Sequence, residues 1–261
     1  MASTDLLKVS IFNSLSGEEM ETNKSEKKTD EMEVTYTPWF YRFVQRFLRR
    51  IAFPFWFRSY SVKIQQTIPE DEPVAVFFNH VSNWDPGVIG ALVPRRLNYP
   101  AKKELFDEAN LFKKIVAKVL YGIGTMPFDR ENPVNSREVL KYILQLLNNG
   151  EGLAFAPEGT RNEDYFRTGE MLPFKMGFLK IILSASAKSV KRGGKPIKCF
   201  PSFINYHPNA GYGSRLMFNV GREIPTDQYV ELTLRGKKEQ AAELLAQRIR
   251  AQMELLKVRP C

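Results

Sequence analysis

The chain has only two histidines and two cysteines among its 261 residues. Two cysteines, Cys199 and Cys261, cannot form a disulfide framework, and Cys199 stands in an apolar run typical of a buried thiol, so we expect a reducing compartment. The sequence also has no cysteine pair, histidine cluster or dense group of carboxylates with metal-ligand spacing. It therefore predicts no metal site and no bound cofactor.

No stretch of the sequence has the pattern of a membrane span. The aromatic-rich stretch 38–57 is interrupted by four arginines, which is too many for a helix that crosses a bilayer. Residues 1–35 lack the basic start and apolar stretch of a signal peptide, and they contain no arginine, which argues against a transit peptide. With eight acids and four lysines they carry a charge of −4, and we expect a disordered acidic tail there.

Three groups of motifs are missing as well. There is no Gly-x-Ser-x-Gly elbow for a serine nucleophile, and Gly122-x-Gly124 lacks the third glycine of a dinucleotide loop. No nucleic-acid-binding motif is present, although the chain is basic. Its net charge is +9, and because residues 1–35 carry −4, residues 36–261 carry +13. A basic body favours an anionic partner, namely a membrane surface, a phosphorylated substrate or an acidic carrier protein, with nucleic acid ranked last.

The stretch 36–60 predicts an amphipathic helical segment that associates with a membrane. Its apolar and basic residues fall on opposite faces of a helix: Phe40, Phe43, Val44, Phe47, Leu48 and Ile51 against Arg42, Arg46, Arg49 and Arg50. Aromatic and arginine side chains are suited to the headgroup layer of an anionic membrane. The alternative is a helix that packs its aromatic face on the domain core.

Residues 61–261 predict one α/β domain. Strand-like runs at 74–78, 97–101, 152–156, 197–206 and 216–220 alternate with helical patterns at 86–92, 111–120, 134–149, 174–187 and 236–257. This alternation predicts a mostly parallel central sheet flanked by helices, with the N-terminal segment as an attachment.

The candidate catalytic pair is His80 and Asp85. His80 follows the apolar run Val74–Phe78, so it lies where a strand gives way to a loop. An Asp that bonds Nδ1 would leave Nε2 free to accept a proton. By itself the pair is a weak signal, since such a spacing arises by accident in roughly one chain in ten.

A second polar loop follows the next buried run. Pro157 ends the strand pattern at 152–156, and Glu158, Gly159, Thr160 and Arg161 come after it. Gly159 permits close backbone approach to a ligand, and the planar guanidinium of Arg161 suits a phosphate. Taken alone, this run is equally compatible with a solvated turn that carries a surface ion pair.

Together the two loops resemble the first and third sequence blocks of the glycerolipid acyltransferase family, of the 1-acylglycerol-3-phosphate acyltransferase type. Four further runs resemble family segments in the expected order: Ala101–Leu105, Gly124–Arg130, Leu172–Gly177 and Cys199–Phe203. The resemblance spans residues 74–206. Small departures, such as Met176 where a lysine is frequent, affect packing more than chemistry and leave the subfamily open.

The resemblance implies acyl transfer from a thioester to the free hydroxyl of 1-acylglycerol-3-phosphate, which gives phosphatidic acid. His80 would be the base and Asp85 its orienting partner. The acceptor phosphate would bind at the following residues: Lys102, Arg130, Glu158, Gly159, Thr160 and Arg161. Lys175 is a weaker candidate, and His207 is interpreted as structural. The expected co-substrate is acyl-CoA or acyl-acyl carrier protein.

Three alternatives remain open at this stage. The chain could acylate another lysophospholipid or glycerol-3-phosphate, it could be a non-catalytic lipid-binding protein of the same fold, or it could be a hydrolase that uses His80 to activate water. In each case we expect a protein that is membrane-associated and faces the cytoplasm or an equivalent reducing compartment.

Overall fold

The computed structural model describes residues 37–107, 109–129 and 137–258; the predicted acidic tail at 1–35 therefore lies outside the described residues. The described chain contains these helices: α1 (Pro38–Phe47), α2 (Phe53–Trp56), α3 (Asp85–Leu92), α4 (Leu111–Gly122), α5 (Arg137–Asn148), α6 (Tyr165–Thr168), α7 (Met176–Lys191), α8 (Asp227–Leu234) and α9 (Lys238–Leu256). Its strands are β1 (Ser59–Ile64), β2 (Val74–Phe77), β3 (Tyr99–Lys102), β4 (Thr125–Phe128), β5 (Gly152–Phe155), β6 (Lys198–His207) and β7 (Arg215–Val220).

The central sheet has five strands in the order β1-β7-β6-β2-β5. Its pairs are parallel except for β6 and β7, which run antiparallel. A two-stranded parallel sheet of β3 and β4 lies next to β5 through a bridge between Asn98 and Leu153. The predicted α/β architecture with a mostly parallel sheet is confirmed.

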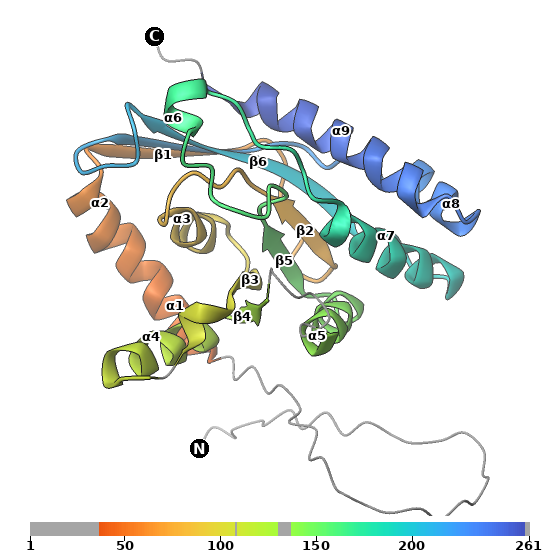
Figure 1. The fold of residues 1–261 in the computed structure, drawn as a ribbon, viewed down its shortest axis with the longest axis horizontal. Coiled ribbons are helices and arrows are strands. Elements are labelled where there is room, and N and C mark those ends of the chain that lie inside the picture. The colour runs from red at the N-terminus through yellow and green to blue at the C-terminus, as the bar shows by residue number, and fades with distance from the viewer. Residues whose placement is uncertain (1–36, 108, 130–136, 259–261) are drawn as a thin grey trace, which may run out of the picture. The chain divides into compact units, whose positions relative to one another are not determined.

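Helices cover both faces of this sheet, with α7, α8 and α9 on one side and α3 on the other (Figure 1). All four residues of β2 and all four of β5 are buried, as the continuous apolar runs in the sequence predict. The carboxyl ends of these two neighbouring strands therefore open onto the same edge of the sheet.

The N-terminal helical segment packs against the domain along one side only. Tyr41 and Gln45 donate hydrogen bonds to the Gly90 carbonyl of α3, and Phe53 is fully buried. A row of residues four apart faces outward instead: Trp39, Phe43, Phe47, Ile51 and Phe55 are 45–72% exposed. Among the residues the structure describes, no helix is long and apolar enough to cross a membrane.

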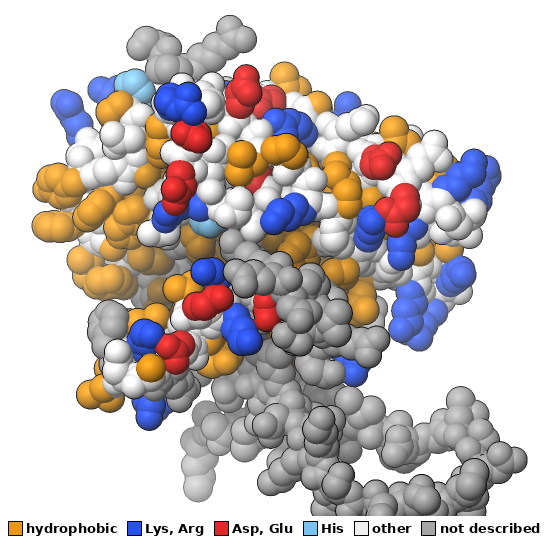
Figure 2. Space-filling model, in the orientation of Figure 1, with side chains coloured by type: hydrophobic (Ala, Val, Ile, Leu, Met, Phe, Trp, Pro, Cys, Tyr) orange, Lys and Arg blue, Asp and Glu red, His pale blue; other side chains and the backbone are white. Residues whose placement is uncertain are grey.

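The predicted division of this segment into one apolar and one basic face is wrong in detail. Val44 and Leu48 turn partly toward the domain, and the Arg49 guanidinium bonds the Ala91 carbonyl, whereas the row from Trp39 to Phe55 is exposed. Trp39, Phe43 and Phe47 form this row within α1, where residues four apart lie on the same side of the helix. The π-helical turn at Leu48–Ala52, which has more than four residues per turn, extends the row to Ile51 and Phe55. The exposed surface therefore carries aromatic and basic side chains side by side, and Figure 2 shows apolar side chains gathered over this end of the molecule.

Candidate active site

Two loops meet at the carboxyl edge of the sheet because the strands that lead into them are parallel neighbours. The loop 79–84 follows β2, and the turn 156–162 follows β5, with Phe77 in register with Phe155. The start of the first loop is fixed by Asn79, which is fully buried and exchanges two hydrogen bonds with the backbone of Ile204 on β6. The base of the site is therefore rigid backbone of three adjacent strands.

His80 and Asp85 form the expected pair. His80 Nδ1 lies 2.9 Å from Asp85 Oδ2, and the His80 side chain is 17% exposed while Asp85 is fully buried. An ionised carboxylate only accepts hydrogen bonds, so Nδ1 carries the proton and Nε2 has the free lone pair. This arrangement can remove a proton from a hydroxyl that approaches from the open side of the ring.

Asp85 is held as a carboxylate by four donors. Its Oδ2 accepts from the backbone N–H groups of Val81 at 2.7 Å and Ser82 at 2.8 Å, besides the His80 ring. Its Oδ1 accepts from the Tyr206 hydroxyl at 2.8 Å. Hydrogen bonds to the charged form compensate for its loss of hydration, so a buried negative charge is stabilised beside the imidazole.

Glu158 joins the two loops. Its Oε1 accepts the His80 backbone N–H at 3.0 Å, and its Oε2 accepts the Leu172 N–H at 2.8 Å. The Asn162 N–H in turn donates to the His80 carbonyl at 2.7 Å, so both backbone groups of His80 are bonded to the 156–162 turn. Burial raises the pKa of Glu158, and the two backbone donors oppose that rise. With 1% of its surface exposed, Glu158 shapes the turn from within.

Two cationic side chains lie at the turn: Arg161 belongs to it, and Lys175 contacts it at Gly159. Arg161 is 2.8 Å from Asn83 of the His80 loop and 2.5 Å from Glu163, and 39% of its side chain is exposed. Gly159 adopts a φ of +71°, and a Cβ there would come within 2.6 Å of the Lys175 side chain. The Lys175 side chain therefore packs across Gly159, and as an exposed residue it adds a second cation to this turn.

The remaining predicted site residues are Thr160, Lys102 and Arg130. Thr160 is exposed on the same turn. Lys102 lies at the end of β3, where its ammonium is 3.7 Å from Glu104. Arg130 lies outside the described residues. The structure thus brings His80, Asp85, Glu158, Gly159 and Arg161 together, and it adds Tyr206, Asn79 and Asn162, which the sequence patterns did not single out.

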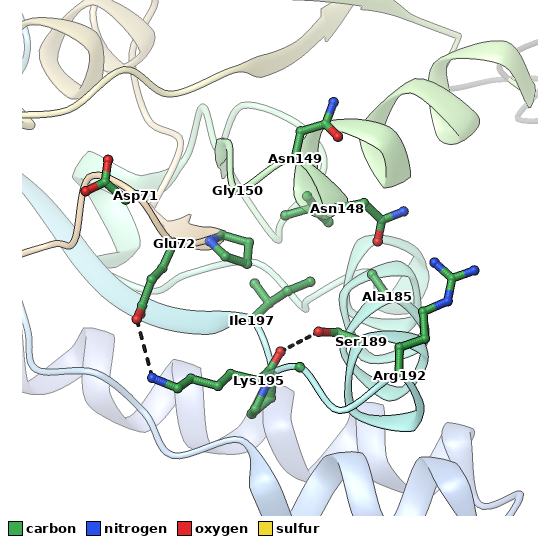
Figure 3. A pocket seen from close by; sticks show the side chains of 14 residues that line it. Asp71, Glu72, Asn148, Asn149, Gly150, Ala185, Ser189, Arg192, Lys195 and Ile197 are labelled. Atoms are coloured by element: carbon green, nitrogen blue, oxygen red, sulfur yellow. Dashed lines mark hydrogen bonds and ion pairs between the residues drawn. The ribbon is translucent and has the colours of Figure 1, made fainter. Parts of the chain in front are cut away.

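The described residues also form a hollow at some distance from His80. A cavity of about 580 Å³ lies at the amino ends of β2, β5 and β6, so it is at the edge of the sheet opposite His80. Figure 3 shows its walls, where Lys195 pairs with Glu72 and accepts a hydrogen bond from Ser189. No group of three His, Cys, Asp or Glu able to hold a metal is found within the described part of the chain.

Comparison with known proteins identifies the family and supports the fold. A family model described as Acyltransferase matches residues 59–201, more than half of the chain. A 1-acyl-sn-glycerol-3-phosphate acyltransferase of Cocos nucifera is 31% identical over 106 residues, which are 40% of this chain but only 32% of that protein. The crystal structure of the 1-acyl-sn-glycerophosphate (LPA) acyltransferase PlsC from Thermotoga maritima is similar with a TM-score of 0.57 at 19% identity, over 85% of this chain and 81% of the other. That likeness supports the fold.

Proposed function

Because this chain belongs to the Acyltransferase family, we propose that it moves a fatty acyl chain from an acyl thioester to the free hydroxyl of 1-acylglycerol-3-phosphate. The product would be phosphatidic acid, for phospholipid synthesis. The observation that carries this proposal is the His80–Asp85 pair joined by hydrogen bonds to a cationic turn, which sets a base beside a place for a phosphate. The curated relative from Cocos nucifera, whose name states this acceptor, adds support.

In the proposed mechanism His80 Nε2 removes the proton of the acceptor hydroxyl as its oxygen attacks the thioester carbon. The Asp85 carboxylate stabilises the imidazolium that forms. The tetrahedral intermediate collapses with cleavage of the C–S bond, and the imidazolium returns the proton to the departing thiolate. An ester and a free thiol result, so the step needs no covalent acyl-enzyme.

We assign the acceptor phosphate to the side chains on the turn, chiefly Arg161, with Lys175 beside it. Lys102 and Arg130 are part of the same proposal, because the family resemblance implies that they bind the phosphate. Glu158, Gly159 and Thr160 contribute by shaping the turn. A guanidinium bonds two phosphate oxygens at once, which fixes the position of the acceptor as well as its charge.

The test is an assay of the purified chain with acyl-CoA and acyl-acyl carrier protein, each with 1-acylglycerol-3-phosphate, with glycerol-3-phosphate and with water alone. Phosphatidic acid that accumulates only with the lysolipid supports the proposal. Thiol release at the same rate without any acceptor would instead identify a hydrolase. Lipid binding without turnover in any combination would leave a non-catalytic protein of the same fold.

Arg161→Ala and Lys102→Ala are expected to weaken the use of phosphate-bearing acceptors by about ten- to a hundredfold in kcat/KM, because each removes a charge-assisted hydrogen bond of roughly 1.5–3 kcal/mol. The measurement compares 1-acylglycerol-3-phosphate with the matching monoacylglycerol. The control is Arg167→Ala, since Arg167 is exposed and pairs only locally with Asp164. Equal losses on both acceptors would show that Arg161 and Lys102 serve the fold or the donor instead.

We further propose that the chain works at a membrane surface and faces the cytoplasm or an equivalent reducing compartment. The membrane contact is supported by an exposed row of large side chains next to Arg42, Arg46 and Arg50. The row consists of Trp39, Phe43, Phe47, Ile51 and Phe55. Aromatic side chains favour the headgroup layer, and each arginine near an anionic surface adds about 1 kcal/mol. Helix α4 exposes Leu111 and Ile115, which would add to the same contact.

Replacement of Phe43, Phe47 and Ile51 by Ser is expected to release the protein from anionic liposomes and to spare the fold, because each of the three is at least 45% exposed. Flotation measures binding, and added salt should weaken the part that the arginines contribute. The control replaces Leu234, Leu244 and Leu255, three exposed leucines of α8 and α9, by Ser and should float normally. Activity on a soluble short-chain acceptor should survive the first replacement better than activity on a long-chain one. Flotation of the Phe43, Phe47 and Ile51 variant like wild type would rule out this contact.

A further inference from the structure

Tyr206 contacts the pair from β6, the strand next to β2. Tyr206 lies near the end of β6 and is 121 residues from Asp85 in the sequence. Its hydroxyl is 2.8 Å from Asp85 Oδ1. The Asp85 oxygen on the other side, Oδ2, faces His80. We propose that Tyr206 is a positioning residue for the proposed reaction, one that fixes the Asp85 carboxylate and sets the basicity that this carboxylate imposes on His80.

The surroundings of Tyr206 hold the phenol in place as a donor. The residue is 8% exposed, and its ring centroid lies 5.9 Å from that of Phe57 and 6.4 Å from that of Phe166. Burial and the neighbouring charge of Asp85 raise the pKa of Tyr206 well above its usual value. The hydroxyl is therefore protonated at any pH at which the enzyme works, and it donates to Asp85 throughout.

One hydrogen bond on Oδ1 changes the proton affinity of His80 through the carboxylate. A donor on Asp85 withdraws charge density from it, so the carboxylate attracts the imidazolium less strongly. Without that donor, the imidazolium is favoured and the pKa of His80 rises. Among the described residues, the Glu158 carboxylate also contacts His80, through its backbone N–H, and Arg161 bonds Asn83 of the same loop. Both stay in place when the Tyr206 hydroxyl is removed.

The first test needs no substrate, so it is independent of the proposed reaction. Because the chain has only two histidines, their ring signals can be followed separately by NMR during a pH titration, with His207 as an internal reference. In Tyr206→Phe we expect the pKa of His80 to rise by about half a unit to one unit and that of His207 to stay constant. Replacement of Tyr206 by 3-fluorotyrosine, a stronger donor, should shift the pKa of His80 in the opposite direction.

The second test is kinetic and rests on the proposed function. Tyr206→Phe should lower kcat roughly tenfold with little change in KM, as expected when an orienting hydrogen bond is lost. The acid limb of the rate profile should move to higher pH, because His80 must be neutral to act. Tyr165→Phe is the matched control: Tyr165 is a buried tyrosine whose ring contacts those of Phe166 and Phe203, and in the described contacts it does not reach Asp85.

The outcomes separate the two proposals. An inactive wild-type chain whose His80 still shifts in Tyr206→Phe would refute the reaction and keep the positioning role. An unchanged His80 pKa in both the Phe and the 3-fluorotyrosine proteins would overturn the positioning role, whatever the activity. The same holds if Tyr165→Phe moves the His80 titration as much as Tyr206→Phe. The 3-fluorotyrosine protein keeps the hydroxyl, so it decides the matter if Tyr206→Phe does not fold.

Discussion

His80→Ala is expected to lower kcat by at least about a hundredfold, because the variant loses the imidazole that we assign as the base for the acceptor proton. His80 presents Nε2 to the open side of the site while Nδ1 is bonded to Asp85. The Ala side chain leaves both backbone bonds of residue 80 to the 156–162 turn intact, so the loop should keep its conformation. Thioester consumption and product formation measure the rate, and circular dichroism measures the fold.

The matched control is His207→Ala, which removes the other histidine. His207 is exposed, and it is the last residue of β6, directly after Tyr206. Its loss should leave the rate near that of wild type. A folded His80→Ala protein that turns over at a normal rate would exclude His80 as the base, and with it the mechanism proposed above.

Asp85→Asn should also cost about a hundredfold or more in kcat, although the fold should survive. The Asn oxygen can take the place of Oδ2 and keep its three N–H donors, while the amide NH₂ faces the Tyr206 hydroxyl, which can turn to accept. What disappears is the negative charge that stabilises the imidazolium. The pKa of His80 should therefore fall, and the acid limb of the rate profile should move to lower pH, opposite to the shift expected for Tyr206→Phe.

Asp85→Ala separates charge from structure. It leaves the backbone N–H groups of Val81 and Ser82 without their acceptor in a buried loop, and each such group costs about 1–3 kcal/mol. We expect a lower melting temperature for Asp85→Ala than for Asp85→Asn, with similar losses of rate. Equal melting temperatures would mean that water replaces the carboxylate, and a normal rate in Asp85→Asn would refute the role of the charge.

Local patterns in the sequence were sufficient for the main strands and for the pair. The apolar runs at 74–78 and 152–156 correspond to β2 and β5, and the helix predicted at 236–257 is α9. His80 and Asp85 are five residues apart, so a single loop can bring them together. These features depend on periodicity and on short separations, both of which can be read from the chain.

Features that depend on long-range pairing could not be predicted in the same way. Strand β1 is mostly exposed, and although its residues Ser-Tyr-Ser-Val-Lys-Ile alternate between polar and apolar, this alternation does not show that the strand pairs in parallel with β7. Tyr206 and Asn79 act across 121 and 125 residues, respectively. The π-helical turn at Leu48–Ala52 has no marker residue in the sequence. In the sequence, Asn79 and Tyr206 are marked only as polar side chains at or just after the end of an apolar run.

The bonds that Glu158 and Asn162 make to the backbone of His80 restrict how this site can be rebuilt. A chimaera that takes the segment 79–85 from one relative and keeps the turn 156–162 of another would pair a loop with a partner of different length or shape. The N–H of residue 80 would then lose its acceptor, and the imidazole would shift relative to Arg161. Acceptor preference should therefore be transplanted only with both segments exchanged together, as a single cassette, however far apart they stand in the chain.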